Sequence, residues 1–116
     1  MEKFMLLVRE DLKKLKEYTD QDREEGVKEM MEWVEGLGDS FLGGEPLWPE
    51  GRYVNKDGIV SDGPFIEAKE GISGYIMIHA ENLEQAAAIA GSCPILQRGE
   101  LEMEVRPVLI SEFPNG

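Results

Sequence analysis

The chain has 116 residues, 41% of them hydrophobic, and its 24 acidic and 12 basic residues give a formal net charge of −12 at pH 7. This length and composition predict a single globular domain over residues 1–116. Binding to nucleic acid or to an anionic membrane requires clustered Lys and Arg, so the charge argues against both as direct partners, although a local basic pocket for a small anion is compatible with it.

The N-terminal part predicts a strand, a short helix and a long helix. Residues 4–9 are mostly apolar and have the length of a buried strand, and the charged residues 10–18 place apolar side chains at helical spacing. Thr19, with Asp22 three residues later, resembles a capping box that begins the long helix. The apolar stripe of that helix is expected to contain Val27, Met30, Met31, Val34 and Leu37.

The remainder predicts a second strand region that opens at Gly43-Gly44-Glu45-Pro46, followed by a hairpin, a strand, a second helix and a last strand. Residues 52–60 read as a hairpin with Asp57-Gly58 as its turn, and residues 74–79 as a strand. Asn82 is expected to cap the second helix, and residues 101–108 alternate as a last strand. The buried stripe of the second helix is expected to contain Leu83, Ala86, Ala87 and Ala90.

This order of elements, β-α-β-β-α-β with an extra hairpin, predicts an α+β protein of the ferredoxin-like type, with both helices on one face of an antiparallel sheet. Ile76 and Ile78 would meet the helices. The second face would carry Tyr75, Met77 and His79, with either the Glu102/Glu104/Arg106 set or its apolar alternate beside them. A face of this mixed character suits a second subunit or a lined cavity better than bulk water, so we expect a homodimer.

Three features bear on the cellular compartment. The single cysteine, Cys93, leaves no intrachain disulfide. No apolar run approaches the roughly 18 residues that cross a bilayer. No signal-peptide pattern precedes the first strand. We therefore expect a cytoplasmic protein without direct contact to membranes.

Motifs along nearly the whole chain resemble one protein family. The central motif is Asp62-Gly63-Pro64-Phe65, and the others are Phe4-Met5-Leu6-Leu7, Gly43-Gly44-Glu45-Pro46-Leu47, Glu67, Lys69-Glu70, Gly74-Tyr75, Ala90, Cys93-Pro94-Ile95 and Glu104-Val105-Arg106-Pro107-Val108. The chain thus resembles the family named for its DGPF motif within the YCII-related domains. It departs from the family pattern at Ser73, where a second glycine is usual, and in the charged residues 10–18.

The resemblance implies a dimeric α/β barrel, in which two ferredoxin-like units pack sheet against sheet. It implies less about function, because the biochemical role of the family is largely unassigned. Relatives are often labelled transcription-initiation proteins, and some more distant YCII relatives are suspected enzymes with a His/Asp pair.

Asp62, His79 and Arg106 are the candidate catalytic residues. Asp62 lies at the expected mouth of the barrel, where Lys69 could serve as an anion contact or acid/base partner, but Asp-Gly-Pro-Phe also fits a turn in which Asp62 accepts backbone hydrogen bonds. His79, the only histidine, could be a general base or a solvated or structurally bonded imidazole.

Arg106 could bind a carboxylate or phosphate in the cavity, or form a salt bridge with Glu102 or Glu104. Lys69, Tyr75 and Trp48 are the candidate ligand-binding residues. A single histidine rules out a histidine metal cluster, and we expect neither a metal nor a cofactor.

The leading hypothesis is a cofactor-free dimeric α/β-barrel protein that binds a small molecule, in a regulatory or accessory role. The first alternative is a lyase or isomerase that acts on a small polar metabolite through Asp62, His79 and Arg106. The second is a transcription-associated adaptor that contacts proteins and not DNA.

Overall fold

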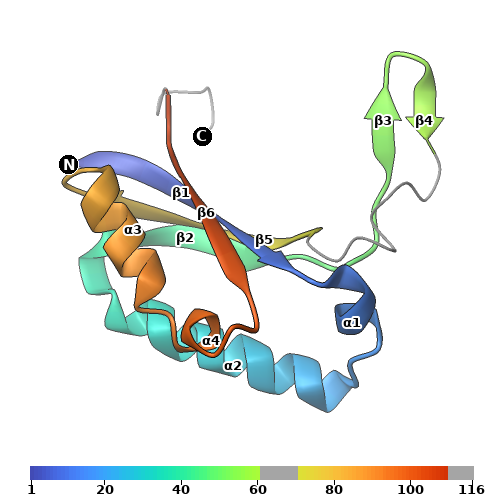
Figure 1. Cartoon of the computed structure of the whole chain (residues 1–116), viewed down its shortest axis with the longest axis horizontal. Helices are drawn as coiled ribbons and strands as arrows, with labels where there is room; N and C mark the ends of the chain where they lie inside the picture. The colour runs from blue at the N-terminus through green and yellow to red at the C-terminus, as the bar shows by residue number, and fades with distance from the viewer. Residues whose placement is uncertain (61–70, 110–116) are drawn as a thin grey trace.

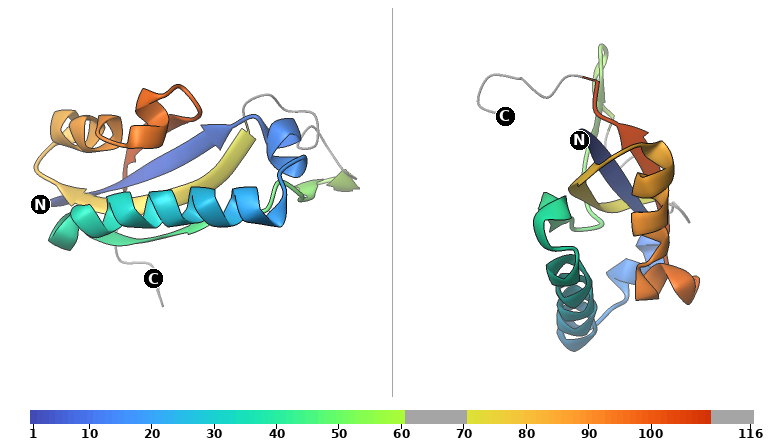
Figure 2. Two further views of the ribbon diagram at one scale, coloured as in Figure 1. Left: turned by 90° about the horizontal axis from the view of Figure 1, so that it is seen from below. Right: turned by 90° about the vertical axis from the view of Figure 1, so that its left-hand side faces the viewer.

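Four strands form one antiparallel sheet in the computed structural model, which describes residues 1–60 and 71–109. The order across the sheet is β2-β5-β1-β6, and the strands are β1 (Glu2–Glu10), β2 (Phe41–Pro46), β5 (Gly71–Ala80) and β6 (Glu102–Pro107). The helices are α1 (Leu12–Lys16), α2 (Asp20–Gly36), α3 (Leu83–Gly91) and α4 (Pro94–Gln97), with a 3-10 turn, η1, at Gly38–Ser40. Figures 1 and 2 show α2, α3 and α4 on one side of the sheet. The ferredoxin-like α+β fold predicted from the sequence is confirmed.

The core lies between this side of the sheet and the helices, because every second residue of the two central strands faces the helices and the residues that do so are mostly apolar. In β1, Phe4 and Leu6 are almost fully buried, and they pair across the sheet with Ile78 and Ile76 of β5. Cys93 joins this core with no exposed surface, as a buried small apolar residue. The prediction that the two isoleucines meet the helices is correct.

The register of β6 decides which of its two residue sets faces the core. Val105 lies opposite Leu6 and packs against the core, whereas Glu104 lies opposite Leu7 on the second face. The charged set Glu102/Glu104/Arg106 therefore joins Tyr75, Met77 and His79 on the second face, and the apolar set faces the helices.

Helix α2 begins as predicted. The Thr19 hydroxyl accepts a hydrogen bond from the Asp22 amide (3.1 Å), and the Asp22 carboxylate accepts one from the Thr19 amide (3.0 Å). The predicted apolar stripe is only partly correct, since Val27 and Met31 are 40% and 54% exposed. Helix α2 contains no fully buried residue among those described, but Met30, Trp33 and Val34 of its second half are partly buried and pack against the core.

Helix α3 also begins as predicted, with the Asn82 side chain accepting from the Gln85 amide (2.8 Å). Ala86 and Ala90 are buried against the sheet, but Leu83 and Ala87 are exposed, which corrects the predicted stripe. Ala87 follows Ala86 directly, and a step of one residue turns a side chain by about 100° away from the buried row.

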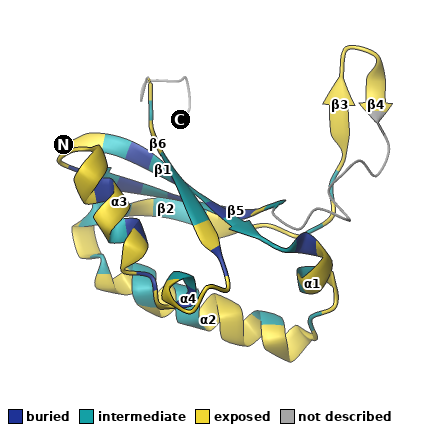
Figure 3. Cartoon of the chain, in the orientation of Figure 1, coloured by how far each residue is buried: buried dark blue, intermediate teal, exposed yellow. Residues whose placement is uncertain are grey.

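The extra hairpin comprises β3 (Tyr53–Asn55) and β4 (Gly58–Val60). Its turn is Lys56-Asp57, one residue earlier than predicted, because Asn55 pairs with Gly58 and accepts a hydrogen bond from the Asp57 amide (2.8 Å). Figure 3 shows that the hairpin extends away from the four-stranded sheet, and its residues 53–59 are exposed. None of the helices within residues 1–60 and 71–109 has the length and apolarity that crossing a bilayer requires.

Candidate functional site

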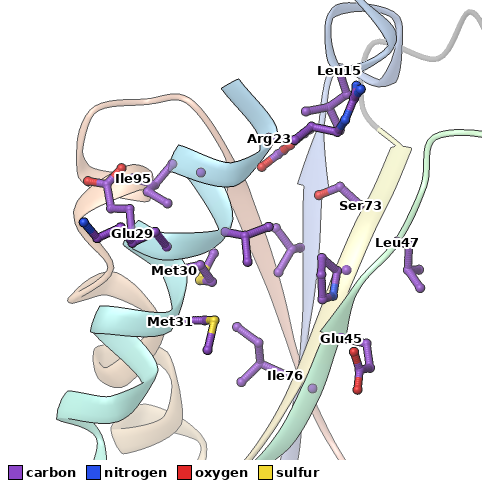
Figure 4. A pocket seen from close by; sticks show the side chains of 18 of the residues that line it. Leu15, Arg23, Glu29, Met30, Met31, Glu45, Leu47, Ser73, Ile76 and Ile95 are labelled. Atoms are coloured by element: carbon purple, nitrogen blue, oxygen red, sulfur yellow. The ribbon is translucent and has the colours of Figure 1, made fainter. Parts of the chain in front are cut away.

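A large groove separates α2 from the face of the sheet that carries the core (Figure 4). Its volume is about 1430 Å³. The sheet side of the groove includes Val8, Ser73, Gly74 and Ile76, and the α2 side includes Val27, Met30, Met31 and Val34. Most of the enclosed surface is thus apolar, which is typical of sites for small organic molecules.

Two polar contacts join α2 to the C-terminal ends of α3 and α4. The Trp33 indole N–H donates to the Ser92 hydroxyl (3.0 Å). Arg98, directly after α4, donates from both terminal nitrogens to the Glu29 carboxylate (2.7 and 2.8 Å). The bidentate pair lowers the pKa of Glu29 and raises that of Arg98. Val27 and Met31 lie on the same helix and border the groove.

Glu10 and Ser73 form the polar end of the groove. The sheet register shifts between Val8 and Arg9, so that Val8 pairs with Gly74 and Arg9 with Ile72, and Ser73 is left between them as a bulge. Ser73 is 9% exposed and forms a side-chain hydrogen bond with Glu10.

The Glu10 carboxyl is half-buried and has a raised pKa. Burial is the main cause, because it disfavours the charged form, and the nearby Glu100 carboxylate adds to it. The Ser73 hydrogen bond acts in the opposite direction and lowers the pKa of Glu10. Such a carboxyl can act as a hydrogen-bond donor when protonated or as a strong acceptor when ionised.

Tyr18 borders the same end, where α1 leads into α2. Burial raises the pKa of its phenol, and the negative charges of Glu10, Glu100, Asp22 and Asp11 raise it further. The effect of four separate carboxylates on one ring indicates a negative electrostatic potential at this end of the groove.

Trp48, which follows β2, and Arg23, in the first turn of α2, both border the groove. The guanidinium of Arg23 lies over the Trp48 ring, 5.0 Å from its centroid. Arg23 also donates to the Tyr18 carbonyl (2.8 Å) and to the Asp20 carboxylate (2.5 Å). Arg23 therefore connects the start of α2 to the Trp48 ring at the border of the groove.

The residues predicted to form a site do not all lie together. Trp48 and Tyr75 border the groove, although strand alternation directs the Tyr75 side chain to the second face. His79 and Arg106 lie on that second face, opposite Lys3 and Met5 of β1. Asp62 and Lys69 lie outside the described residues, and the proposed roles of all these residues stay predictions.

Arg106 lies 3.6 Å from Glu104, which is the salt bridge that the sequence offered as its simpler role. The Arg106 side chain is 67% exposed. Glu104 also accepts a hydrogen bond from Arg9 (3.2 Å), so the charged part of the second face is a small network.

Sequence reasoning missed Glu10, Tyr18 and Arg23 as residues of the groove. Ser73 was noted only as a departure from a family pattern that favours glycine. That departure was the available signal, because it places a hydroxyl group beside the Glu10 carboxyl. Within the described part of the chain, no three or more His, Cys, Asp or Glu side chains are grouped so that they could hold a metal ion.

Comparison with protein families finds a match between residues 3–109 and the YCII-related domain. A comparison with curated proteins finds no match to the chain. The family match covers the helices and strands that the structure describes, except the first residue of β1.

Proposed function

Since the chain belongs to the YCII-related domain family, we propose that it is a small-molecule-binding protein whose ligand site is the groove between α2 and the sheet. The observation that carries this proposal is the combination of an apolar groove of about 1430 Å³ with a half-buried carboxyl at one end. Apolar walls supply affinity, and a few placed polar groups supply orientation.

The groove favours binding over catalysis by the predicted residues. His79 and Arg106 lie on the opposite face of the sheet, so a ligand in the groove meets Glu10, Ser73 and Tyr18 in their place. Binding there fits a regulatory or accessory role, in which occupancy of the groove changes the packing of α2.

A metabolite screen by thermal shift tests this function. A ligand that binds only the folded chain raises the melting temperature as its concentration exceeds its Kd. We expect at least one small organic molecule to do so. Failure of a broad metabolite set to shift the melting temperature would contradict the proposal.

The site of binding is tested by filling the groove. Val27→Trp places a bulky ring on the groove side of α2, where Val27 is 40% exposed, and we expect it to weaken the binding of a screen ligand by about tenfold or more. The matched control is Val54→Trp on the hairpin, where Val54 is 65% exposed and outside the groove. Equal affinities in the two variants, measured by calorimetry, would place the ligand elsewhere.

We further propose that the chain forms a homodimer through the second face of the sheet. Met5, Leu7, Tyr75 and Met77 form a half-buried apolar centre on that face, with charged residues of β6 beside them. Helices α2, α3 and α4 lie on the other side of the sheet and leave this face uncovered. Its apolar centre suits burial against the same face of a second copy of the chain.

Analytical ultracentrifugation tests the assembly. We expect a species of about twice the 13.0 kDa chain mass at micromolar concentration. Leu7→Glu, which places a charge at the centre of the face, is expected to shift the distribution to monomer. The control Leu83→Glu changes a 46% exposed residue of α3 on the other side of the sheet and should leave the mass unchanged. A wild-type chain that sediments only as a monomer would refute the proposal.

A further inference from the structure

We infer that the groove takes an amphipathic organic cation, with an amine or quaternary ammonium group beside Glu10 and an apolar body between α2 and the sheet. This inference rests on the binding function proposed above and adds the chemical class of the ligand. It follows from three features of the groove: its carboxyl-rich end, the pairing of the nearby arginines with acids and its aromatic rings.

The first feature is the charge at the polar end. Glu10 is half-buried, and the groups that act on its carboxyl are the Ser73 hydroxyl and a second acid, Glu100. Tyr18 is within electrostatic range of both of these acids and of Asp22. A ligand cation would compensate the charge that burial makes unfavourable on Glu10, whereas a ligand carboxylate or phosphate would add to it.

The second feature is that the arginines described near the polar end have acidic partners; Lys28 is exposed and borders the groove on α2. Arg98 is shared by two carboxylates, Glu29 at 2.7 Å and Glu100 at 2.9 Å. Arg9 pairs with Glu104, and Arg23 with Asp20. Lys14 is exposed and borders a smaller cavity of about 280 Å³ that also includes Glu10 and Glu100.

In the described part of the chain, none of the ion pairs joins a lysine or arginine to Glu10. A carboxyl at the end of an apolar groove is thus available to a cation that the ligand brings.

The third feature is the aromatic lining. The Tyr18 ring lies at the acidic end, and an ammonium group is attracted both to carboxylates and to the face of an aromatic ring. The position of Arg23 over Trp48 is an internal example, in which a cation occupies an aromatic surface at the border of this groove. The apolar stretch formed by Val27, Met30 and Ile76 would then cover the hydrocarbon part of the ligand.

The test compares three probes of equal chain length with the full protein by isothermal titration calorimetry. The probes are octyltrimethylammonium, 1-octanol and octanoate, each below the concentration at which it self-associates. We expect the cation to bind about tenfold more tightly than the alcohol, and octanoate to bind most weakly.

Glu10→Gln identifies the group responsible. The amide has nearly the same shape and can still accept the Ser73 hydrogen bond, but it carries no charge. We expect this variant to bind octyltrimethylammonium about tenfold more weakly and 1-octanol unchanged. The control is Glu84→Gln, which removes the same charge from the exposed first turn of α3, outside the groove, and should leave all three affinities unchanged.

Each result has a defined meaning. Equal binding of the cation and the alcohol, or tighter binding of octanoate, would overturn the inference but leave the groove as a binding site. A preference for the cation that persists in Glu10→Gln would also overturn it. If no probe binds while the metabolite screen yields a ligand that Val27→Trp excludes, the inference fails alone. If neither approach yields a ligand, the proposed function fails with it.

Discussion

Ile78→Ala is expected to lower the free energy of unfolding by about 2–5 kcal/mol. Ile78 lies on the central strand β5, has no exposed surface and is paired with Phe4 on β1. Truncation removes three carbon atoms from a packed core and leaves a cavity, because strands on both sides of β5 restrict its movement. Chemical denaturation followed by circular dichroism measures this loss.

The matched control for this substitution is Ile59→Ala on β4. Ile59 is 70% exposed, so the same change in chemistry is expected to alter stability by less than about 0.5 kcal/mol. Both variants should be compared with the wild type at one protein concentration, because the proposed dimerisation would make apparent stability depend on concentration. Similar losses in the two variants would contradict the assignment of the core.

Gly44→Ala is expected to lower the free energy of unfolding by about 1–3 kcal/mol and to weaken ligand binding. A Cβ atom at position 44 would collide with the carbonyl oxygen of Tyr75 on the neighbouring strand. That oxygen belongs to the backbone and cannot rotate away, so β2 has to separate from β5. Because Gly44 and the following residues of β2 also border the groove, the change should appear in the affinity for a groove ligand as well.

Gly26→Ala provides a control with the opposite expected sign. Gly26 lies within α2, and a Cβ atom there meets no other atom within 4 Å. Alanine is favoured over glycine inside a helix, so we expect stability to rise by about 0.5–1 kcal/mol. Parallel unfolding curves for the two variants test both signs, and a stabilising Gly44→Ala would contradict the close approach of β2 and β5.

The sequence was sufficient for the fold because local signals and the global arrangement agree. The apolar run of β1, the alternating residues of β6, the capping box at Thr19 and the cap at Asn82 each indicate one element, and their order leaves few topologies. What the pattern did not fix was the face toward which the charged set of β6 points. That choice depends on the register against β1, which a single strand does not encode.

The groove was not predictable for a related reason. Helical periodicity identifies Val27 and Met31 as residues of the inner side of α2, but it does not say how far the helix lies from the sheet. That distance depends on contacts with residues far away in the chain, such as Trp33 with Ser92 and Glu29 with Arg98. The bulge that places Ser73 beside Glu10 is likewise a property of two paired strands.

The two edges of the sheet have a consequence for aggregation. Edge strands expose backbone groups that can recruit strands from other molecules, and charges, prolines and irregular pairing all oppose this. On β6, the charged Glu102, Glu104 and Arg106 precede Pro107, whereas β2 is irregular between Phe41 and Gly43 and ends at Pro46. Both edges thus oppose growth of the sheet into fibrils. The apolar centre of the second face is therefore available for a specific contact, while the edges protect the chain from amyloid-like assembly.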